Sequence, residues 1–197
     1  FLDNEGKLIE DLNHNSIKAI GVPGTVAGLF LAHRKYGKLP WSVLIQPSVD
    51  LAQKGFPMTW SLYQEAQWLS RESSSKSFIQ NYFKNSKDVL TRPGELWKQP
   101  ALAKTLTLIR DKGQDGFYKG AVAEEIEQFM IQNGGILTKK DLEKYQAIER
   151  KPIKGSYKGY DIYSMPPPSS GGVALVEMLN MMECANLKEL EFNSTGY

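Results

Sequence analysis

The sequence predicts an α+β protein that is mainly helical, with one small β element near its C-terminal end. Three observations support this prediction. Apolar residues recur at helical spacing through most of residues 23–146. Residues 145–165 alternate instead, and they are rich in β-branched and aromatic side chains. A corner rich in proline and glycine at 166–172 then leads into a further apolar helix at 172–184.

Length and composition are those of an ordinary globular protein. The 197 residues suffice for one domain, which we expect to span residues 1–197, and 41% of them are hydrophobic. Lys and Arg number 24 against 22 Asp and Glu, so the net charge of +2 gives no basic footprint for nucleic acid. No apolar stretch approaches the roughly 18 residues that a membrane-spanning helix needs.

The sequence contains few residues that could bind a metal ion or form a disulfide. Cys184 is the single cysteine, so no disulfide can form within the chain, and we expect it to be a small buried hydrophobe. His14 and His33 are the only histidines and have no metal-ligand spacing. We therefore expect no metal and no cofactor.

The first predicted helix follows an extended run or short strand at Ala19–Val22. Pro23 and Gly24 form a turn, and Thr25 or a neighbour is expected to cap the helix. Gly37 is a plausible C-terminal stop.

The next segment, PWSVLIQPSVDLAQKG at 40–55, predicts two helical turns broken by Pro47 and ended by Gly55. Thr59 is then expected to cap a helix, because an apolar stripe follows it. That stripe is Leu62, Ala66 and Leu69, and the nearby aromatic residues Trp60, Tyr63 and Trp68 are interpreted as core.

Three further helices are predicted between residues 100 and 144. Pro100 suits the first position of a helix that Gly113 ends, and Gly134 ends the next. Thr138 and Asp141 have the spacing of a capping box. The apolar faces of the first two helices are Leu102, Leu106 and Ile109, and Val122, Ile126, Phe129 and Met130.

Residues 145–165 predict two or three strands, as a hairpin with Gly155 and Gly159 as turn points. Three prolines at 166–168 end this region, because proline cannot donate to a sheet ladder. Gly171 and Gly172 open the last helix, whose predicted apolar face is Val173, Val176, Leu179 and Met182.

The segment SMPPPSSGG at 164–172 raises the question of chemistry. It matches neither the Gly-x-Ser-x-Gly elbow of a serine nucleophile nor a phosphate-binding glycine loop. A triad assembled in space stays open, but helix capping is the favoured role of Ser169 and Ser170. Close backbone packing is favoured over anion binding for the two glycines.

Two other polar groups receive structural interpretations. Glu124, Glu125 and Glu127 lie early in a helix, where solvated charge is favoured over acid–base chemistry. Residues 193–195, Asn-Ser-Thr, fit the glycosylation acceptor pattern, although capping also explains them. The residues themselves therefore display no catalytic constellation.

Several motifs together resemble the heavy subunit of gamma-glutamyltransferases, also called gamma-glutamyltranspeptidases or glutathione hydrolases. The likeness runs in order over nearly the whole chain and is weakest at 71–98. It rests on GVPGTVAGL at 21–29, KYGKLPW at 35–41, QPSVDLAQKGF at 46–56, GFYKGAVAEEI at 116–126 and NGGILTKKDLEKYQAIERKPIKGSYKGYDIYSMPPPSSGG at 133–172.

This resemblance implies an N-terminal nucleophile hydrolase, in which helices flank a central pair of β-sheets (αββα). A precursor of this family cleaves itself into two subunits. The new N-terminal Thr of the small subunit attacks the gamma-glutamyl amide, with its own α-amine as the base. The acyl-enzyme then passes the gamma-glutamyl group to water, an amino acid or a peptide.

The resemblance further implies that the chain is a central fragment of the heavy subunit and is inactive alone. The family's nucleophile lies downstream of Tyr197, and its carboxylate-binding Arg lies upstream of Phe1. The family's catalytic serine pair belongs to the small subunit and is distinct from Ser169 and Ser170. No catalytic, substrate-binding or metal-binding residue is therefore assigned to this chain.

Partners and location follow from the same resemblance. The expected partners are the remainder of the heavy subunit, the small subunit and a gamma-glutamyl substrate, in a periplasmic or secreted protein. A fragment should also expose an apolar surface, through which it could dimerise. Two alternatives stay open: a related acylase or poly-gamma-glutamate-processing enzyme, and a non-catalytic helical binding module.

Overall fold

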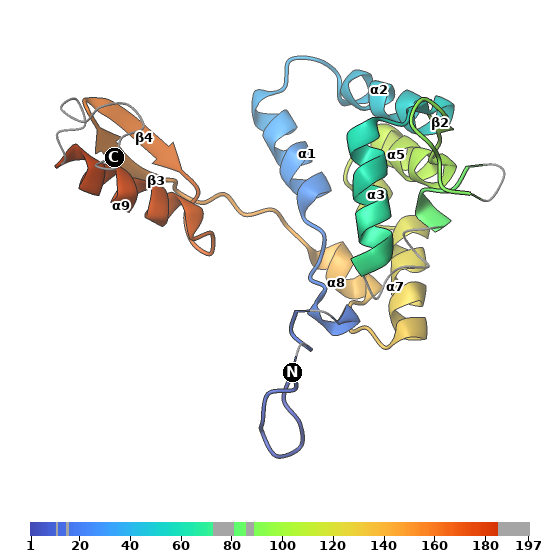
Figure 1. Ribbon diagram of the computed structural model, residues 1–197, viewed down its shortest axis with the longest axis horizontal. Helices are drawn as coiled ribbons and strands as arrows, with labels where there is room; N and C mark the ends of the chain where they lie inside the picture. Colours follow the sequence, from blue (N-terminus) through green and yellow to red (C-terminus); the bar gives the residue numbers. More distant parts are fainter. Residues whose placement is uncertain (11, 15, 73–80, 86–88, 185–197) are drawn as a thin grey trace. The chain divides into compact units, whose positions relative to one another are not determined.

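A computed structural model describes residues 1–197 except 11, 15, 73–80, 86–88 and 185–197 (Figure 1). The chain divides into two compact units, Phe1–Ala147 and Ile148–Tyr197, and each is described by itself. The expectation that residues 1–197 form a single domain stays a prediction. The Asn-Ser-Thr sequence at 193–195 lies outside the described residues.

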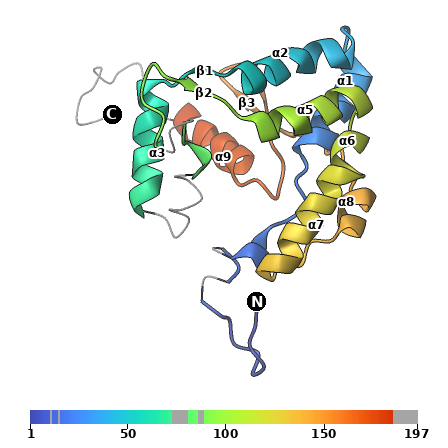
Figure 2. The same ribbon diagram turned by 90° about the vertical axis from the view of Figure 1, so that its right-hand side faces the viewer.

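The first unit is mainly helical, as predicted. Figure 2 shows α2 and α5 side by side, and β1 and β2 form a short antiparallel pair in which Phe56 lies opposite Trp97. The elements are η1 (Ile17–Ala19), α1 (Thr25–Tyr36), α2 (Trp41–Lys54), β1 (Phe56–Pro57), α3 (Trp60–Glu72), β2 (Leu96–Trp97), α5 (Pro100–Lys112), α6 (Asp115–Tyr118), α7 (Ala121–Asn133) and α8 (Lys139–Lys144).

The hydroxyl of Tyr118 organises the larger of the two core clusters in this unit. It donates a hydrogen bond of 2.6 Å to the carbonyl of Pro23 and accepts one of 3.2 Å from the amide of Ala27. The ring of Tyr118 also stacks on that of Tyr145, at 5.6 Å between centroids. Burial raises the pKa of Tyr118, so its hydroxyl stays protonated at neutral pH and keeps donating. The buried members of the cluster are Ala27, Tyr118, Ala123, Met130, Leu137 and Leu142.

A second core cluster lies where α3 meets the β1–β2 pair. Ala66 is fully buried on α3, and the rings of Phe83 and Trp97 stack at 4.9 Å. The buried hydroxyl of Thr91 donates to the carbonyl of Phe83 at 2.7 Å, so its polar atom is satisfied. The buried members are Met58, Ala66, Phe83 and Trp97.

Several predicted helix ends are confirmed. Thr59 caps α3, since its hydroxyl accepts from the amide of Leu62 at 3.2 Å. Pro100 occupies the first turn of α5. Thr138 and Asp141 form a reciprocal capping box at the start of α8. Gly134 ends α7 in the left-handed conformation, with φ 74°.

The predicted break at Pro47 is wrong, because α2 runs through it without interruption. Proline has no N–H for the carbonyl of Val43, but Val43 lies on the exposed side of α2, where water can satisfy that group. Contacts with α5 hold the helix on the other side. The indole nitrogen of Trp41 donates to the carbonyl of Ile109 at 2.8 Å.

The start of α1 lies where it was predicted. Of the two predicted candidates, Thr25 or a neighbour, the neighbour Gly24 is the N-cap, and it makes no side-chain hydrogen bond. A Cβ at position 24 would collide with the hydroxyl of Tyr145, so the glycine leaves room for that side chain. In the preceding run, Ala19 ends a 3₁₀ turn, Ile20 is extended and residues 20–22 form no strand, so the strand alternative is wrong. Gly37 ends the helix as predicted.

Some predicted core positions are exposed. Trp60 and Trp68 are 63% and 59% exposed on α3, so only Tyr63 of the aromatic set is partly buried. Helical spacing locates the apolar face of a helix but not its limits, and these two side chains lie beyond the contact with β1 and β2. Leu102 on α5 and Phe129 on α7, also predicted on apolar faces, are exposed too.

The second unit contains the predicted hairpin. It consists of β3 (Ile153–Tyr157) and β4 (Tyr160–Ser164), paired antiparallel, and α9 (Gly171–Glu183) follows. Gly159 lies in the turn with φ 83°, as predicted.

Gly155 is not a turn residue, because it lies in the middle of β3. A Cβ there would come within 2.6 Å of Val176 Cγ1 on α9. The glycine therefore lets the helix approach the sheet. Cys184 follows α9 and is exposed, so its predicted burial is wrong.

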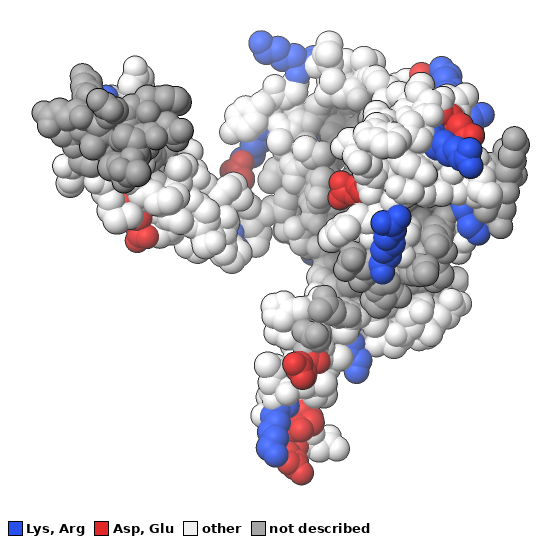
Figure 3. Space-filling model, viewed as in Figure 1, with Lys and Arg blue, Asp and Glu red and all other residues white. Residues whose placement is uncertain are grey.

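Charges of both signs are interspersed over the first unit on the face shown in Figure 3. Several of them form helix-surface pairs, such as Lys119 with Asp115 at 3.0 Å. Within the described residues, no helix is long and apolar enough to cross a membrane.

The role of Tyr118 can be tested with Tyr118→Phe. We expect the free energy of unfolding to fall by about 1–3 kcal/mol, because the variant leaves the Pro23 carbonyl and the Ala27 amide without their buried partner. Tyr36→Phe is the matched control on exposed surface and should change stability by less than about 0.5 kcal/mol. Urea denaturation measures both, and equal effects would contradict the assigned role.

Candidate functional site

The corner at 166–172 has the predicted position between a strand and a helix. It follows the end of β4, and the Pro167–Pro168 peptide bond is cis. Arg150 donates to the carbonyl of Pro167 at 3.1 Å, and the amide of Ser169 donates to the carbonyl of Pro166 at 3.3 Å. The corner is therefore a turn in which backbone carbonyls accept the stabilising hydrogen bonds.

The corner's serines do not have their predicted capping role. Ser170 is the N-cap of α9, but its side chain makes no capping hydrogen bond. Among the described residues, neither the Ser169 nor the Ser170 hydroxyl has a hydrogen-bonded base. The close-packing interpretation of the glycines is confirmed at Gly172, where a Cβ would collide with the carbonyl of Met165.

Neither histidine belongs to a metal or catalytic cluster in the part of the chain that the structure describes. The Nε2 atom of His33 lies 2.8 Å from the carbonyl oxygen of Leu39, and its ring packs edge-on against Trp41. His14 is exposed in a turn. The described residues contain no cluster of three or more His, Cys, Asp or Glu side chains arranged to hold a metal ion.

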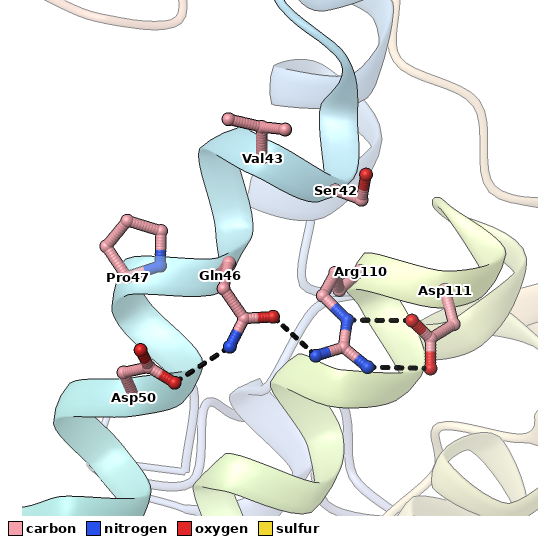
Figure 4. A pocket seen from close by; sticks show the side chains of 7 residues that line it. All are labelled: Ser42, Val43, Gln46, Pro47, Asp50, Arg110 and Asp111. Carbon is pink, nitrogen blue, oxygen red and sulfur yellow. Dashed lines mark hydrogen bonds and ion pairs between the residues drawn. The ribbon is translucent and has the colours of Figure 1, made fainter.

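A shallow groove of about 510 Å³ lies along α2 and α5, and several charged and polar side chains line it (Figure 4). Gln46 donates to Asp50 at 2.8 Å, and Arg110 donates to the Gln46 side-chain oxygen at 2.6 Å. Two further bonds, of 2.7 and 3.1 Å, join Arg110 to both oxygens of Asp111. Figure 4 shows that these four side chains form one continuous chain of hydrogen bonds across the two helices.

The hydrogen bonds between these four side chains stabilise the charged forms of Asp50, Arg110 and Asp111. The hydrogen bond from Gln46 lowers the pKa of Asp50, and Lys54 acts in the same direction. The hydrogen bonds from Arg110 lower the pKa of Asp111, and Asp111 raises that of Arg110 in return. Both carboxylates are therefore charged at neutral pH and already paired. These hydrogen bonds join α2 to α5, and they occupy both carboxylates of the groove.

Two of the three early acids of α7 hold the start of α8. Glu124 accepts a 2.6 Å bond from the Lys139 ammonium, and Glu127 accepts from the Lys139 amide at 2.8 Å. The hydrogen bond to Glu124 raises the pKa of Lys139. Glu124 is exposed, as expected, although it also pairs with Lys139, whereas Glu127 is partly buried, so the expectation that these acids face water is wrong for Glu127.

Comparisons with known proteins decide the family. The sequence profile described as gamma-glutamyltranspeptidase matches residues 1–197. The chain belongs to the gamma-glutamyltranspeptidase family. It is 42% identical to the glutathione hydrolase proenzyme of Escherichia coli K12 over 200 residues, which cover 98% of this chain and 33% of that protein. The glutathione hydrolase proenzyme of Pseudomonas aeruginosa is also 42% identical, over 100% of this chain and 35% of that protein.

Solved structures agree with the sequence comparison. The gamma-glutamyltranspeptidase of Helicobacter pylori superposes with a TM-score of 0.89 at 42% identity, over 99% of this chain and 56% of that one. The predicted family and fold class are thereby confirmed. The chain spans about a third of the length of the curated relatives it matches.

The groove residues were absent from the sequence-based candidates. The spacing of Gln46, Asp50 and Lys54 is the visible signal, since residues four apart meet on one helix face. The bond to Arg110 joins positions 64 residues apart, so helical spacing alone could not predict it.

The pairing in the groove can be tested by NMR titration of the carboxyl carbons. Arg110→Met should raise the pKa of Asp111 towards its ordinary value, and Gln46→Leu should raise that of Asp50 while Asp111 stays low. Each variant is the control for the other. If the pKa values of Asp50 and Asp111 are unchanged in both variants, the hydrogen bonds from Gln46 and Arg110 do not stabilise these carboxylates.

The lowered pKa values of Asp50 and Asp111 determine how these groups change the stability of the protein with pH. A carboxyl with a lowered pKa in the folded state stabilises the protein above its unfolded pKa. This contribution is lost as the pH falls below about 4, through the folded pKa. Both variants should therefore make stability less dependent on pH in that acidic range.

Proposed function

We propose that the whole protein is a gamma-glutamyltransferase and glutathione hydrolase. It cleaves gamma-glutamyl amides such as glutathione and transfers the gamma-glutamyl group to water, amino acids or peptides. The observation that carries this proposal is the family match over residues 1–197, together with 42% identity to glutathione hydrolase proenzymes.

In this proposal the chemistry takes place outside the present chain. A precursor cleaves itself, and the new N-terminal Thr attacks the gamma-glutamyl carbonyl carbon. Its α-amine accepts the hydroxyl proton and passes it to the leaving amine nitrogen, and the C–N bond breaks as the acyl-enzyme ester forms. Attack by water or an acceptor amine on that ester then releases the gamma-glutamyl group and restores the Thr.

The chain itself contributes scaffold in this proposal. Its polar clusters are satisfied internally, as the groove from Asp50 to Asp111 and the Lys139 contacts illustrate. Its proposed partners are the remainder of the heavy subunit and the small subunit of the same precursor. The proposed location is periplasmic or secreted.

The activity can be tested on the full-length protein with a chromogenic gamma-glutamyl anilide. We expect release of the aniline, faster with a dipeptide acceptor, and no turnover from residues 1–197 alone. Parallel assays with glutathione, a cephalosporin side-chain amide and poly-gamma-glutamate distinguish the hydrolase from the two alternative substrate classes. Turnover of a cephalosporin amide or of poly-gamma-glutamate, with none of glutathione, would contradict the proposal.

The corner serines provide a second test. The full-length Ser169→Ala and Ser170→Ala variants should retain kcat/KM within about twofold, because neither hydroxyl contacts a base among the described residues. The measurement is the same anilide assay. Loss of turnover in either variant, with folding intact by circular dichroism, would assign the chemistry to this corner instead.

A further inference from the structure

A small pocket of the first unit lies where three segments of the chain meet. Its volume is about 260 Å³, which is below the roughly 300 Å³ at which sites for drug-sized ligands begin. One face of α1 forms one wall, the residue before α6 a second, and the residues that follow α8 a third. The lining residues include Phe30, Leu31, Arg34, Gln114, Tyr145 and Gln146.

Neighbouring contacts hold the aromatic walls of this pocket in place. The ring of Phe30 packs edge-on against that of Trp41, at 5.1 Å between centroids. A Cβ at Gly113 would come within 2.7 Å of the Phe30 ring, so the backbone there also lies against it. The ring of Tyr145 stacks on that of Tyr118. Because both walls are already positioned, a ligand would lose little binding free energy to ordering them.

The polar side chains of the pocket are an exception to the internal pairing seen elsewhere in this unit. The side chains of Arg34, Gln114 and Gln146 make no hydrogen bond or ion pair with any described residue. The guanidinium of Arg34 therefore has its planar fork of N–H donors available for an anion. Each carboxamide offers donors and an acceptor, which is what an amide group of a ligand needs.

We infer that this pocket binds an N-acyl amino acid with a branched apolar side chain. The guanidinium of Arg34 donates two parallel hydrogen bonds to the carboxylate of the ligand. The carboxamides of Gln114 and Gln146 pair with the amide N–H and C=O of the acyl group. The apolar side chain of the ligand packs against the rings of Phe30 and Tyr145.

Charge distinguishes this ligand class from its neighbours. Arg34 is the only charged side chain among the described residues that line the pocket. A free amino acid would bring an ammonium group to a lining without an acidic residue, and acylation removes that charge. A dicarboxylate or a doubly charged phosphate would leave its second negative charge without a cationic partner. A single carboxylate beside a neutral amide therefore matches the lining best.

Titration of the full-length protein with N-acetyl-leucine, followed by ligand NMR, tests the inference. A ligand of this size should bind with a Kd of about 1 mM. Two comparison compounds should bind about tenfold more weakly or not at all. They are N-acetyl-leucinamide, which lacks the carboxylate, and leucine, which lacks the acyl group. The inference is overturned if N-acetyl-leucine does not bind, or if either comparison compound binds equally well.

Substitution of Arg34 locates the binding within the protein. Arg34→Gln should raise the Kd for N-acetyl-leucine about tenfold or more, because it removes the charge-assisted hydrogen bonds to the carboxylate. Arg71→Gln is the matched control, since it removes the same charge from the exposed surface of α3, and it should leave the Kd unchanged. Equal Kd values for the two variants would place the ligand elsewhere and overturn the inference.

A third variant tests the amide contact and covers the case in which Arg34→Gln fails to fold. Gln114→Leu should weaken the binding of N-acetyl-leucine severalfold but leave that of 4-methylpentanoate unchanged, because this acid has a similar apolar body and no amide. An equal effect on both acids would overturn the inference. Circular dichroism verifies the folding of each variant. No measurement here needs gamma-glutamyl turnover, so the result is separate from that of the activity assay.

Discussion

The hydroxyl of Tyr118 is the contact on which the first unit depends most. It joins the loop before α1 to α6, through one bond to the Pro23 carbonyl and one to the Ala27 amide. Ala27 N–H lies in the first turn of α1, where no helical carbonyl is available, so Tyr118 supplies a partner that the helix lacks. The same ring stacks on Tyr145, whose hydroxyl occupies the space that a Cβ at Gly24 would need. Residues from three distant parts of the chain therefore constrain one another.

This arrangement gives a physical reason for the motif GVPGTVAG. Pro23 offers its carbonyl to Tyr118, and Gly24 leaves room for Tyr145. The motif's best evident role in this chain is therefore to fix how the chain enters α1. The groove along α2 and α5 has the same character, since its polar atoms bind one another. Both features support a scaffold role and place no reacting group in the described chain.

The sequence predicted those features that depend on neighbours along the chain. Thr138 and Asp141 lie three residues apart, so their capping box follows from local chemistry. The hairpin turn at Gly159 and the helix stop at Gly134 are local in the same sense. Gamma-glutamyltranspeptidase membership was recognisable because several local motifs recur in a fixed order.

Features that depend on distant partners were missed. The short pairing of Phe56 with Trp97 joins residues 41 positions apart, and neither strand has enough residues for an alternating pattern. Helix α2 passes through Pro47 because α5 supports it, which a local rule for proline cannot include. The exposure of Trp60 depends on what else packs against α3, and composition carries no information about that.

The contact between Gly155 and Val176 has an evolutionary consequence. The space that a Cβ would need at position 155 is occupied by the valine methyl groups, at 2.6 and 2.9 Å. A larger residue at 155 therefore becomes acceptable only after position 176 has become smaller. The two sites are energetically coupled, because each substitution alone disturbs a contact that the pair together would preserve. Homologous chains should change these two positions jointly, and the order of the two changes should matter.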